Sequence, residues 1–190
     1  MPSAVCDACV LYPAPLRDLL LRLDEDGLVR VRWSEMILDE CFGAILANRK
    51  DLSSSALERT RGLMTTHFPG AMVRQFEGLA VEIALPDDGD RHVVAAAVRA
   101  GVRLIVTFNM RDFPPGPLAS SGIAAQHPDD FLLSVLASNE DRFCRVVREQ
   151  AVACRDPPFT VMELLDNLER GGLVQTVRRL RQIMRPLGWI

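Results

Sequence analysis

The feature that most constrains this chain is the regular alternation of short apolar segments with amphipathic ones over its first two thirds. Residues 5–11 and 102–107 are rich in apolar and β-branched side chains, which favours buried strands. Further strands are predicted at residues 29–33, 71–76 and 123–126, and helices at residues 13–27, 35–48, 55–67 and 90–100. Strands that alternate with helices form parallel sheets, so we expect an α/β fold, a parallel sheet flanked by helices.

The last third of the chain has a different pattern, which is helical throughout. Helices are predicted to begin at Pro128 and near residue 139, and Thr160 with Glu163 matches the capping box of a third helix. Two glycines, at 171 and 172, separate that helix from a final one. We therefore expect two domains, an α/β domain over residues 1–127 and an all-helical C-terminal extension over residues 128–190.

Composition narrows the class of protein further. Apolar residues make up 48% of the 190 and charged residues 25%, which is typical of globular chains rather than disordered ones. No segment approaches the ~18 consecutive apolar residues of a membrane span, and the N-terminus lacks the pattern of a secretory signal. These observations lead us to expect a soluble, cytoplasmic protein.

The net charge of −3 argues against a simple basic clamp for nucleic acid, yet the cations are unevenly distributed. Five arginines and no acid lie within residues 170–190. Arg178, Arg181 and Arg185 are three and four positions apart, so we expect them on one face of the final helix, where they would bind RNA or a protein partner. The alternative is a solvated helix face. The opposite positions are expected to pack inward: Val174, Val177, Leu180 and Ile183.

The five cysteines do not indicate a disulfide framework, because their number is odd and no secretion signal accompanies them. Cys6 and Cys9 form a C-x-x-C pair, and a redox pair of this kind lies at a helix N-terminus. Here the pair falls on the predicted strand at residues 5–11. The other cysteines and the histidines lack zinc-ligand spacing, so we expect buried, apolar cysteines.

Four acids from separate segments could meet at one end of the predicted sheet. Asp7 lies on the first strand, Glu40 lies within a largely apolar helix, Asp90 opens a helix, and Asp112 follows the strand at residues 102–107. A cluster of carboxylates suits Mg²⁺ or Mn²⁺, which can align a phosphate for attack by metal-bound water. The alternatives are that Asp90 is a plain helix cap, Asp112 a loop acid, and Glu40 a core acid neutralised by an arginine.

Other α/β enzymes with an aspartate at the first strand match less well. Receiver domains and haloacid-dehalogenase-like phosphatases need a lysine late in the fold, whereas the single lysine, Lys50, precedes the predicted strand at residues 102–107. The phosphatases also need an acid where Cys9 stands. No glycine-rich loop with a lysine is present for a P-loop enzyme. The histidines are not spaced for a catalytic triad, and His92 is expected to pack against or cap its own helix.

Four acidic blocks of the chain resemble those of PIN domains, in particular the VapC-type toxins of bacterial toxin–antitoxin modules. The likeness extends in order from residue 4 to about residue 130, and some relatives also carry a helical C-terminal extension. The third block is the most specific, because its acid-rich turn, Arg-His pair and alanine-rich helix occur together. The blocks are Cys6-Asp-Ala-Cys-Val-Leu-Tyr-Pro13, Ile37-Leu-Asp-Glu40, Leu85-Pro-Asp-Asp-Gly-Asp-Arg-His-Val-Val-Ala-Ala-Ala97 and Ile105-Val-Thr-Phe-Asn-Met-Arg-Asp-Phe113.

The resemblance implies a metal-dependent endoribonuclease whose central acids, catalytic and metal-binding, are Asp7, Glu40 and Asp90. Asp112 matches the fourth acid, and Thr107 and Asn109 match polar positions that orient metal or phosphate. Many PIN proteins carry asparagine where Cys9 stands, so a hydrogen bond near the metal is expected to be missing here.

The resemblance also implies a biological role. We expect a cytoplasmic toxin that hydrolyses RNA phosphodiester bonds with Mg²⁺ or Mn²⁺, forms a homodimer and is inhibited by a small antitoxin. An antitoxin arginine could bind the same acids as the metal. The alternatives are a housekeeping RNA-processing PIN nuclease without an antitoxin, and a non-catalytic PIN-like scaffold that binds RNA or protein.

Overall fold

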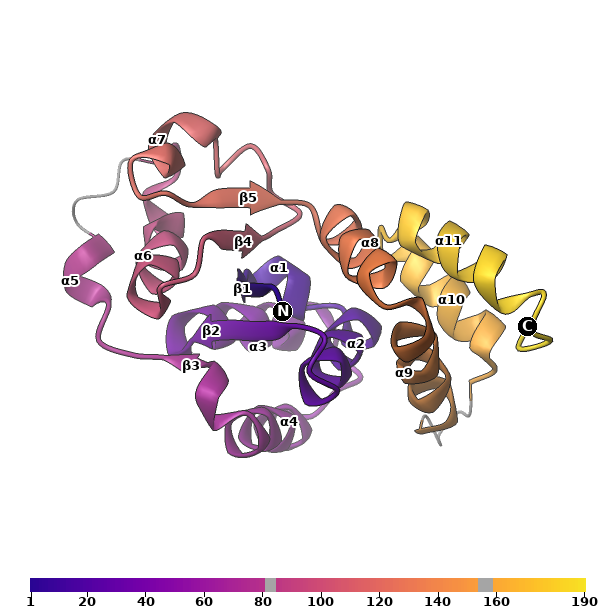
Figure 1. The fold of residues 1–190 in the computed structure, drawn as a ribbon. Helices are drawn as coiled ribbons and strands as arrows, with labels where there is room; N and C mark the ends of the chain where they lie inside the picture. Colours follow the sequence, from indigo (N-terminus) through magenta and orange to yellow (C-terminus); the bar gives the residue numbers. More distant parts are fainter. Residues whose placement is uncertain (81–84, 154–158) are drawn as a thin grey trace. The chain divides into compact units, whose positions relative to one another are not determined.

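A computed structural model describes residues 1–80, 85–153 and 159–190 of the chain, which divide into two compact units (Figure 1). The sheet unit comprises residues 3–12 and 31–126, and the helical unit comprises residues 1–2, 13–30 and 127–190. The predicted all-helical extension thus shares its unit with a helix from the N-terminal part of the chain. The boundary that we predicted between domains at residue 127 remains a prediction.

The sheet has five strands, and its pairings of β1 with β4, β2 with β3 and β4 with β5 are parallel, which confirms the predicted α/β fold class. Along the sheet the order is β3-β2-β1-β4-β5, so β1 and β4 are interior strands, with Val5 paired to Ile105. Their apolar side chains are buried, as expected for strands that are covered on both faces. The strands are β1 (Ser3–Cys6), β2 (Arg30–Ser34), β3 (Met72–Val73), β4 (Leu104–Val106) and β5 (Ala124–Gln126).

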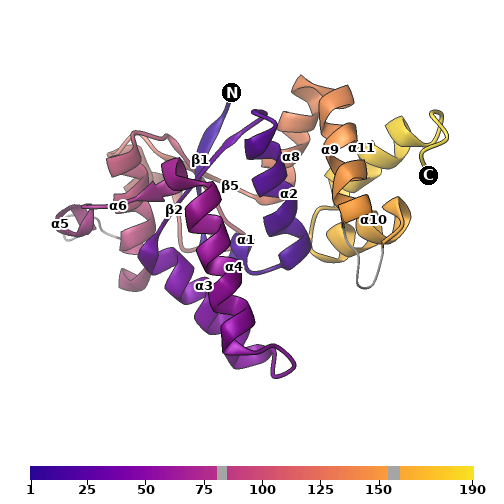
Figure 2. The same cartoon turned by 90° about the horizontal axis from the view of Figure 1, so that it is seen from below.

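Local signals explain the helices of the sheet unit. Ser34 caps α3 (Glu35–Asn48) by accepting a hydrogen bond from the backbone N–H of Ile37 at 3.2 Å. Gly101, with φ of 65°, ends α6 (Arg91–Ala100) in the left-handed conformation that glycine adopts readily. The other helices here are α1 (Ala8–Leu11), α4 (Ser54–His67), α5 (Glu77–Ala80) and α7 (Pro115–Ala119); α3 and α4 lie side by side (Figure 2).

Four sequence predictions are wrong in detail. The first strand ends at Cys6, because the Asp7 side chain accepts from the N–H of Ala8 at 2.6 Å and starts α1 there. Ser55 and Glu58 match a capping box that predicts Ser55 as the cap of α4, but Ser53 accepts from the N–H of Ala56, so α4 begins earlier than predicted. The segment at residues 71–76 contributes a strand of two residues only. Residues 113–117, whose three prolines predict a loop, include the start of α7.

The helical unit contains α2 (Ala14–Glu25), α8 (Pro128–Ser138), α9 (Glu140–Ala153), α10 (Val161–Arg170) and α11 (Val174–Met184). Both hydrogen bonds of the predicted capping box at Thr160 and Glu163 form at the start of α10. The buried Asp129 accepts the N–H groups of Gln175 and Thr176, each at 2.8 Å, and so joins α8 to the first turn of α11. No strand occurs in the described part of residues 128–190, as predicted.

The sequence also predicts a break between helices at Pro157 and Pro158, and this pair lies outside the described residues. Among the helices that are described, none combines the length and the apolar character needed to cross a membrane.

Candidate active site

Three of the four predicted acids line one cavity of the sheet unit. The cavity has a volume of about 360 Å³ and lies at the carboxyl ends of β1 and β4, where ligands bind in parallel α/β sheets. Asp112 and Thr107 are not among its described lining residues, although both lie nearby. The cavity is lined by Asp7, Ala8, Cys9, Tyr12, Glu40, Cys41, Ala44, Asp90 and Asn109.

The carboxylate of Asp7 is fixed by hydrogen bonds on both oxygens. Its side chain is 4% exposed, Oδ1 accepts the N–H of Ala8, and Oδ2 accepts the hydroxyl of Thr107 at 2.7 Å. Thr107 in turn accepts the N–H of Asn109 at 2.9 Å. A buried carboxylate whose oxygens accept this many hydrogen bonds is held in one orientation. The Thr107 hydroxyl therefore positions Asp7, and the direct contact with metal or phosphate that we predicted for it remains a prediction.

The expectation that a hydrogen bond is missing at Cys9 is wrong. The Cys9 thiol donates to Oδ2 of Asp7 at 3.0 Å, contacts Oγ1 of Thr107 at 3.4 Å and accepts the N–H of Phe108 at 3.4 Å. Burial, followed by the negative charge of Asp7, raises the pKa of Cys9 to about 12. The thiol is thus protonated at neutral pH and can act as the donor that asparagine supplies in many PIN proteins.

The C-x-x-C pair is not a redox site, although part of our reasoning was wrong. Cys9 does lie on a helix, α1, but its raised pKa is the opposite of what a reactive thiolate requires. Cys6, Cys41 and Cys144 are buried and Cys9 is half-buried, and none of these four forms a disulfide. The three buried cysteines agree with the prediction, whereas Cys9, which forms hydrogen bonds with Asp7 and Phe108, does not, and Cys154 lies outside the described residues.

Glu40 and His92 form a contact between helices that sequence reasoning missed. Oε1 of Glu40 lies 2.8 Å from Nε2 of His92, whose side chain is 4% exposed. The Glu40 side chain is 47% exposed, so the alternative of a buried core acid neutralised by an arginine is wrong. His92 is buried as expected, yet it positions the Glu40 carboxylate and does not cap α6. The only sequence signal was its place two residues after Asp90 in the third acidic block.

The acids of the cavity interact electrostatically. The pKa of Asp90 is raised to about 6, first by burial and then by the charges of Asp7, Asp112, Asp87 and Glu40. Asp112 therefore belongs to the charged cluster even though it does not line the cavity. Asp90 makes no side-chain capping bond, so the alternative of a plain helix cap is wrong. Mutual repulsion of this kind is relieved by a bound cation.

Comparison with known proteins assigns both parts of the chain. The family model described as PIN domain matches residues 3–111. This chain belongs to the PIN domain family. A second model, described as VapC50 C-terminal domain, matches residues 128–182, which confirms the resemblance to VapC-type proteins with a helical extension.

One curated relative has 48% identity to this PIN protein over 79 residues. It is named "Putative ribonuclease VapC50" and comes from Mycobacterium tuberculosis (strain ATCC 25618 / H37Rv). The match covers 42% of this chain and 47% of the relative, so the chain spans about half the length of that protein. No solved structure matches the chain.

Two arginines of the sheet unit, Arg61 and Arg91, form ion pairs with acids that do not line the cavity of this PIN domain. Arg61 forms ion pairs with Glu35 and Asp39, and Arg91 forms one with Asp88. None of these pairs includes Asp7 or Asp90. These two arginines therefore do not relieve the repulsion among the carboxylates of Asp7, Glu40 and Asp90, here called the inner acids. Glu40 also has no arginine partner among these ion pairs, because its partner is His92.

The inner acids suit a hard divalent cation by their chemistry. All the candidate ligand atoms are carboxylate oxygens, which Mg²⁺ and Mn²⁺ prefer. In the described residues no three His, Cys, Asp or Glu side chains lie close enough together to ligate one ion. Binding therefore requires the exposed Glu40 side chain and the half-buried Asp90 to turn toward Asp7, which is itself held in place.

The three predicted arginines lie in the other unit. Arg178, Arg181 and Arg185 line a cavity between α10 and α11.

Proposed function

We propose that this PIN protein is a metal-dependent endoribonuclease that hydrolyses RNA phosphodiester bonds. The observation that carries the proposal is the convergence of Asp7, Glu40 and Asp90, from three separate segments, on one cavity at the carboxyl end of the sheet. The raised pKa of Asp90 supports it, because acids gathered against their own repulsion are typical of a functional site. The ribonuclease name of the VapC50 relative also supports it.

Each residue would have a defined role. Asp7, Glu40 and Asp90 would hold Mg²⁺ or Mn²⁺, which supplies activated water and neutralises charge on the phosphate. Thr107 and Cys9 hold the Asp7 carboxylate, and His92 contacts that of Glu40, which would turn toward Asp7 when the metal binds. Asn109 lies exposed at the cavity, where its amide can donate to a phosphate oxygen.

Substitution of Asp7 tests the proposal directly. Asp7→Asn keeps the shape of the side chain and removes one ligand charge, so we expect cleavage of a labelled RNA to fall by about 100-fold or more. Asp51→Asn is the matched control, because it removes the same charge from an exposed acid bound to Arg49. Circular dichroism checks that both variants fold. Full activity in Asp7→Asn, or in wild type with excess EDTA, would contradict the proposal.

We further propose that the nuclease is the toxin of a toxin–antitoxin pair in the cytoplasm and forms a homodimer. The match to the VapC50 C-terminal domain supports this role, and the inner acids offer an antitoxin arginine a bidentate partner. Expression should arrest growth, Asp7→Asn should not, and co-expression of the adjacent open reading frame should restore growth. A chain that is harmless when overexpressed and has no such neighbour would favour the housekeeping nuclease. Light scattering measures the oligomeric state.

A further inference from the structure

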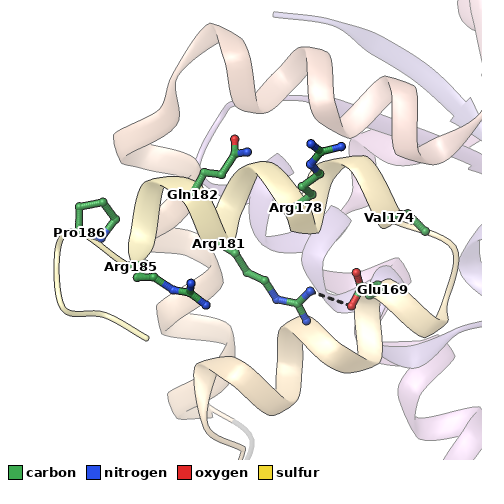
Figure 3. Close-up of a pocket in the computed structure, with 7 residues that line it drawn as sticks. All are labelled: Glu169, Val174, Arg178, Arg181, Gln182, Arg185 and Pro186. Atoms are coloured by element: carbon green, nitrogen blue, oxygen red, sulfur yellow. Dashed lines mark hydrogen bonds and ion pairs between the residues drawn. The ribbon is translucent and has the colours of Figure 1, made fainter.

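Helices α10 and α11 enclose a cavity of about 510 Å³ in the helical unit (Figure 3). Three arginines follow one another along α11 at this cavity, with Arg181 between Arg178 and Arg185 (Figure 3). The outer two are seven positions apart, so their backbone positions differ by about 10 Å along the helix axis and by little in rotation. The cavity is lined by Glu169, Val174, Arg178, Arg181, Gln182, Arg185 and Pro186.

The three arginines are not equivalent. Arg181 donates to Asp166 at 2.6 Å and to Glu169 at 2.8 Å, so its charge is neutralised and it fastens α11 to α10. Arg178 and Arg185 are exposed, and within the described residues neither forms an ion pair. In Figure 3 the guanidinium group of Arg178 points away from Glu169. The cavity therefore presents two guanidinium groups, of Arg178 and Arg185, that have no acidic partner among the described residues. Arg181 links the two helices that form the cavity.

The buried face of α11 differs slightly from the predicted one. Val177 and Leu180 are buried as expected, but Val174 is 54% exposed and Ile183 is half-buried. Met184 takes the inward place at the end of the helix. Relative to the predicted orientation, the helix is rotated so that Val174 lines the cavity instead of packing into the core. This rotation leaves the arginine row facing outward, with apolar side chains only at the two ends of the cavity, Val174 and Pro186.

We propose that Arg178 and Arg185 bind the phosphodiester backbone of single-stranded RNA. The proposal rests on the proposed nuclease function, because it concerns the substrate of that reaction. The acids Asp7, Glu40 and Asp90 repel a polyanion, so beyond the proposed metal ion affinity for RNA needs cations elsewhere on the chain. Arg178 and Arg185 lie in one row, and no acid of the described residues forms an ion pair with either of them, so they can supply that affinity.

The character of the lining favours a nucleic-acid backbone over an acidic peptide. A helical peptide binds a groove through apolar anchors at intervals of three and four residues, and Val174 and Pro186 are the only apolar residues in the described lining. Among the described lining residues none is aromatic, so the side chains on which proteins most often stack bases are missing there. We therefore expect contact with phosphates alone and no preference for sequence.

Binding of a labelled RNA to full-length protein tests the proposal. The probe is a fluorescent 20-nucleotide single-stranded RNA of mixed sequence, and all proteins carry Asp7→Asn so that the probe is not cut. The test variant is Arg178→Gln/Arg185→Gln. The matched control is Arg170→Gln/Arg179→Gln, which removes the same charge from the same unit at arginines outside the lining; Arg179 is bound to Glu140.

The expected result follows from counterion release. Each lost phosphate contact lowers the slope of log affinity against log salt by about 0.7, so the test variant should lose a slope of about 1.4 and about 25-fold in affinity at 0.1 M salt. The control should change little. Unchanged RNA binding in the test variant, or an equal loss in the control, would overturn the proposal.

Two further measurements distinguish RNA binding from peptide binding at the cavity, and the RNA site from the proposed nuclease function. A labelled peptide of alternating glutamate and leucine residues reports on acidic peptides: if it loses affinity in the test variant while RNA does not, the cavity binds peptide and the proposal is wrong. RNA cleavage by protein that retains Asp7 tests the proposed nuclease activity separately. If no RNA is cut but the test variant still loses RNA binding, the RNA site stands and the proposed function fails. If RNA is cut and the test variant binds RNA as well as before, the proposed function stands and the RNA site fails.

Discussion

Replacing Asp90 with asparagine isolates the electrostatic cost of gathering the acids at the cavity. The side chain makes no capping hydrogen bond, and asparagine has nearly the same shape, so the substitution removes the charge and little else. The ordinary pKa of this carboxyl is 3.8, and burial together with neighbouring carboxylates raises it to about 6 in the folded protein. Removing the charge should therefore stabilise the metal-free protein at neutral pH.

The magnitude and its sign follow from proton linkage. Between pH 3.8 and about 6 the folded state binds more protons at Asp90 than the unfolded state does, so wild-type stability falls as the pH rises through that window. Above pH 6 the full penalty is about 3 kcal/mol. Since the side chain is only half-buried, solvent screening reduces this to about 1–2 kcal/mol. Below pH 3.8 the carboxyl is protonated in both states, and the penalty vanishes.

Urea denaturation of wild type and Asp90→Asn in metal-free buffer, at pH 4 and pH 7.5, measures the effect. We expect Asp90→Asn to be more stable by about 1–2 kcal/mol at pH 7.5 and equal to wild type near pH 4. Added Mg²⁺ should narrow the difference, because it binds the native wild type preferentially. The control Asp88→Asn removes the same charge from an exposed acid paired with Arg91, and should not stabilise. Equal stability at pH 7.5, or the same gain at both pH values, would refute the reasoning.

Two further predictions concern buried polar groups. Asp129→Ala leaves the N–H groups of Gln175 and Thr176 without their acceptor, so unfolding by urea should show a loss of about 2–4 kcal/mol, and a loss below 1 kcal/mol would contradict this interpretation. The Cys9 thiol, with a pKa of about 12, should react with iodoacetamide at pH 8 roughly a thousandfold more slowly than an ordinary cysteine in metal-free buffer. Mass spectrometry of the labelled peptides measures the rate, and labelling of Cys9 at the rate of a small thiol would be the contrary outcome.

The sequence predicted those elements whose local signals agree with their tertiary setting. The β-branched run before Thr107 forms an interior strand, and Gly101 ends α6 where a glycine was expected. Where several local signals compete, the sequence does not choose between them. Each of three consecutive serines could cap α4, and Ser53 does so although Ser55 stands at the start of the capping-box motif. Helix α1 is too short to be predicted by periodicity, because the Asp7 side chain starts it.

The candidate site was likewise predictable only in part. The acids could be predicted because the topology of a parallel sheet brings the residues after its strands to one edge. The contact of Glu40 with His92 could not, since it joins two helices, α3 and α6, through residues that are 52 positions apart in the sequence. The pairing of Arg181 could have been inferred. Asp166 and Glu169 are three positions apart on α10, and the glycine pair folds α11 back along that face.

The distribution of ion pairs links the proposed nuclease activity to its proposed inhibition. In the sheet unit Arg61 and Arg91 bind acids outside the cavity, which leaves the carboxylates of Asp7 and Asp90 to repel each other. A cation from outside the chain lowers that energy whether it is a metal ion or the guanidinium group of an antitoxin. Both would use the same oxygens, so the two should compete. The arrangement that would favour metal binding by the acids would therefore also let a single arginine inhibit the proposed enzyme.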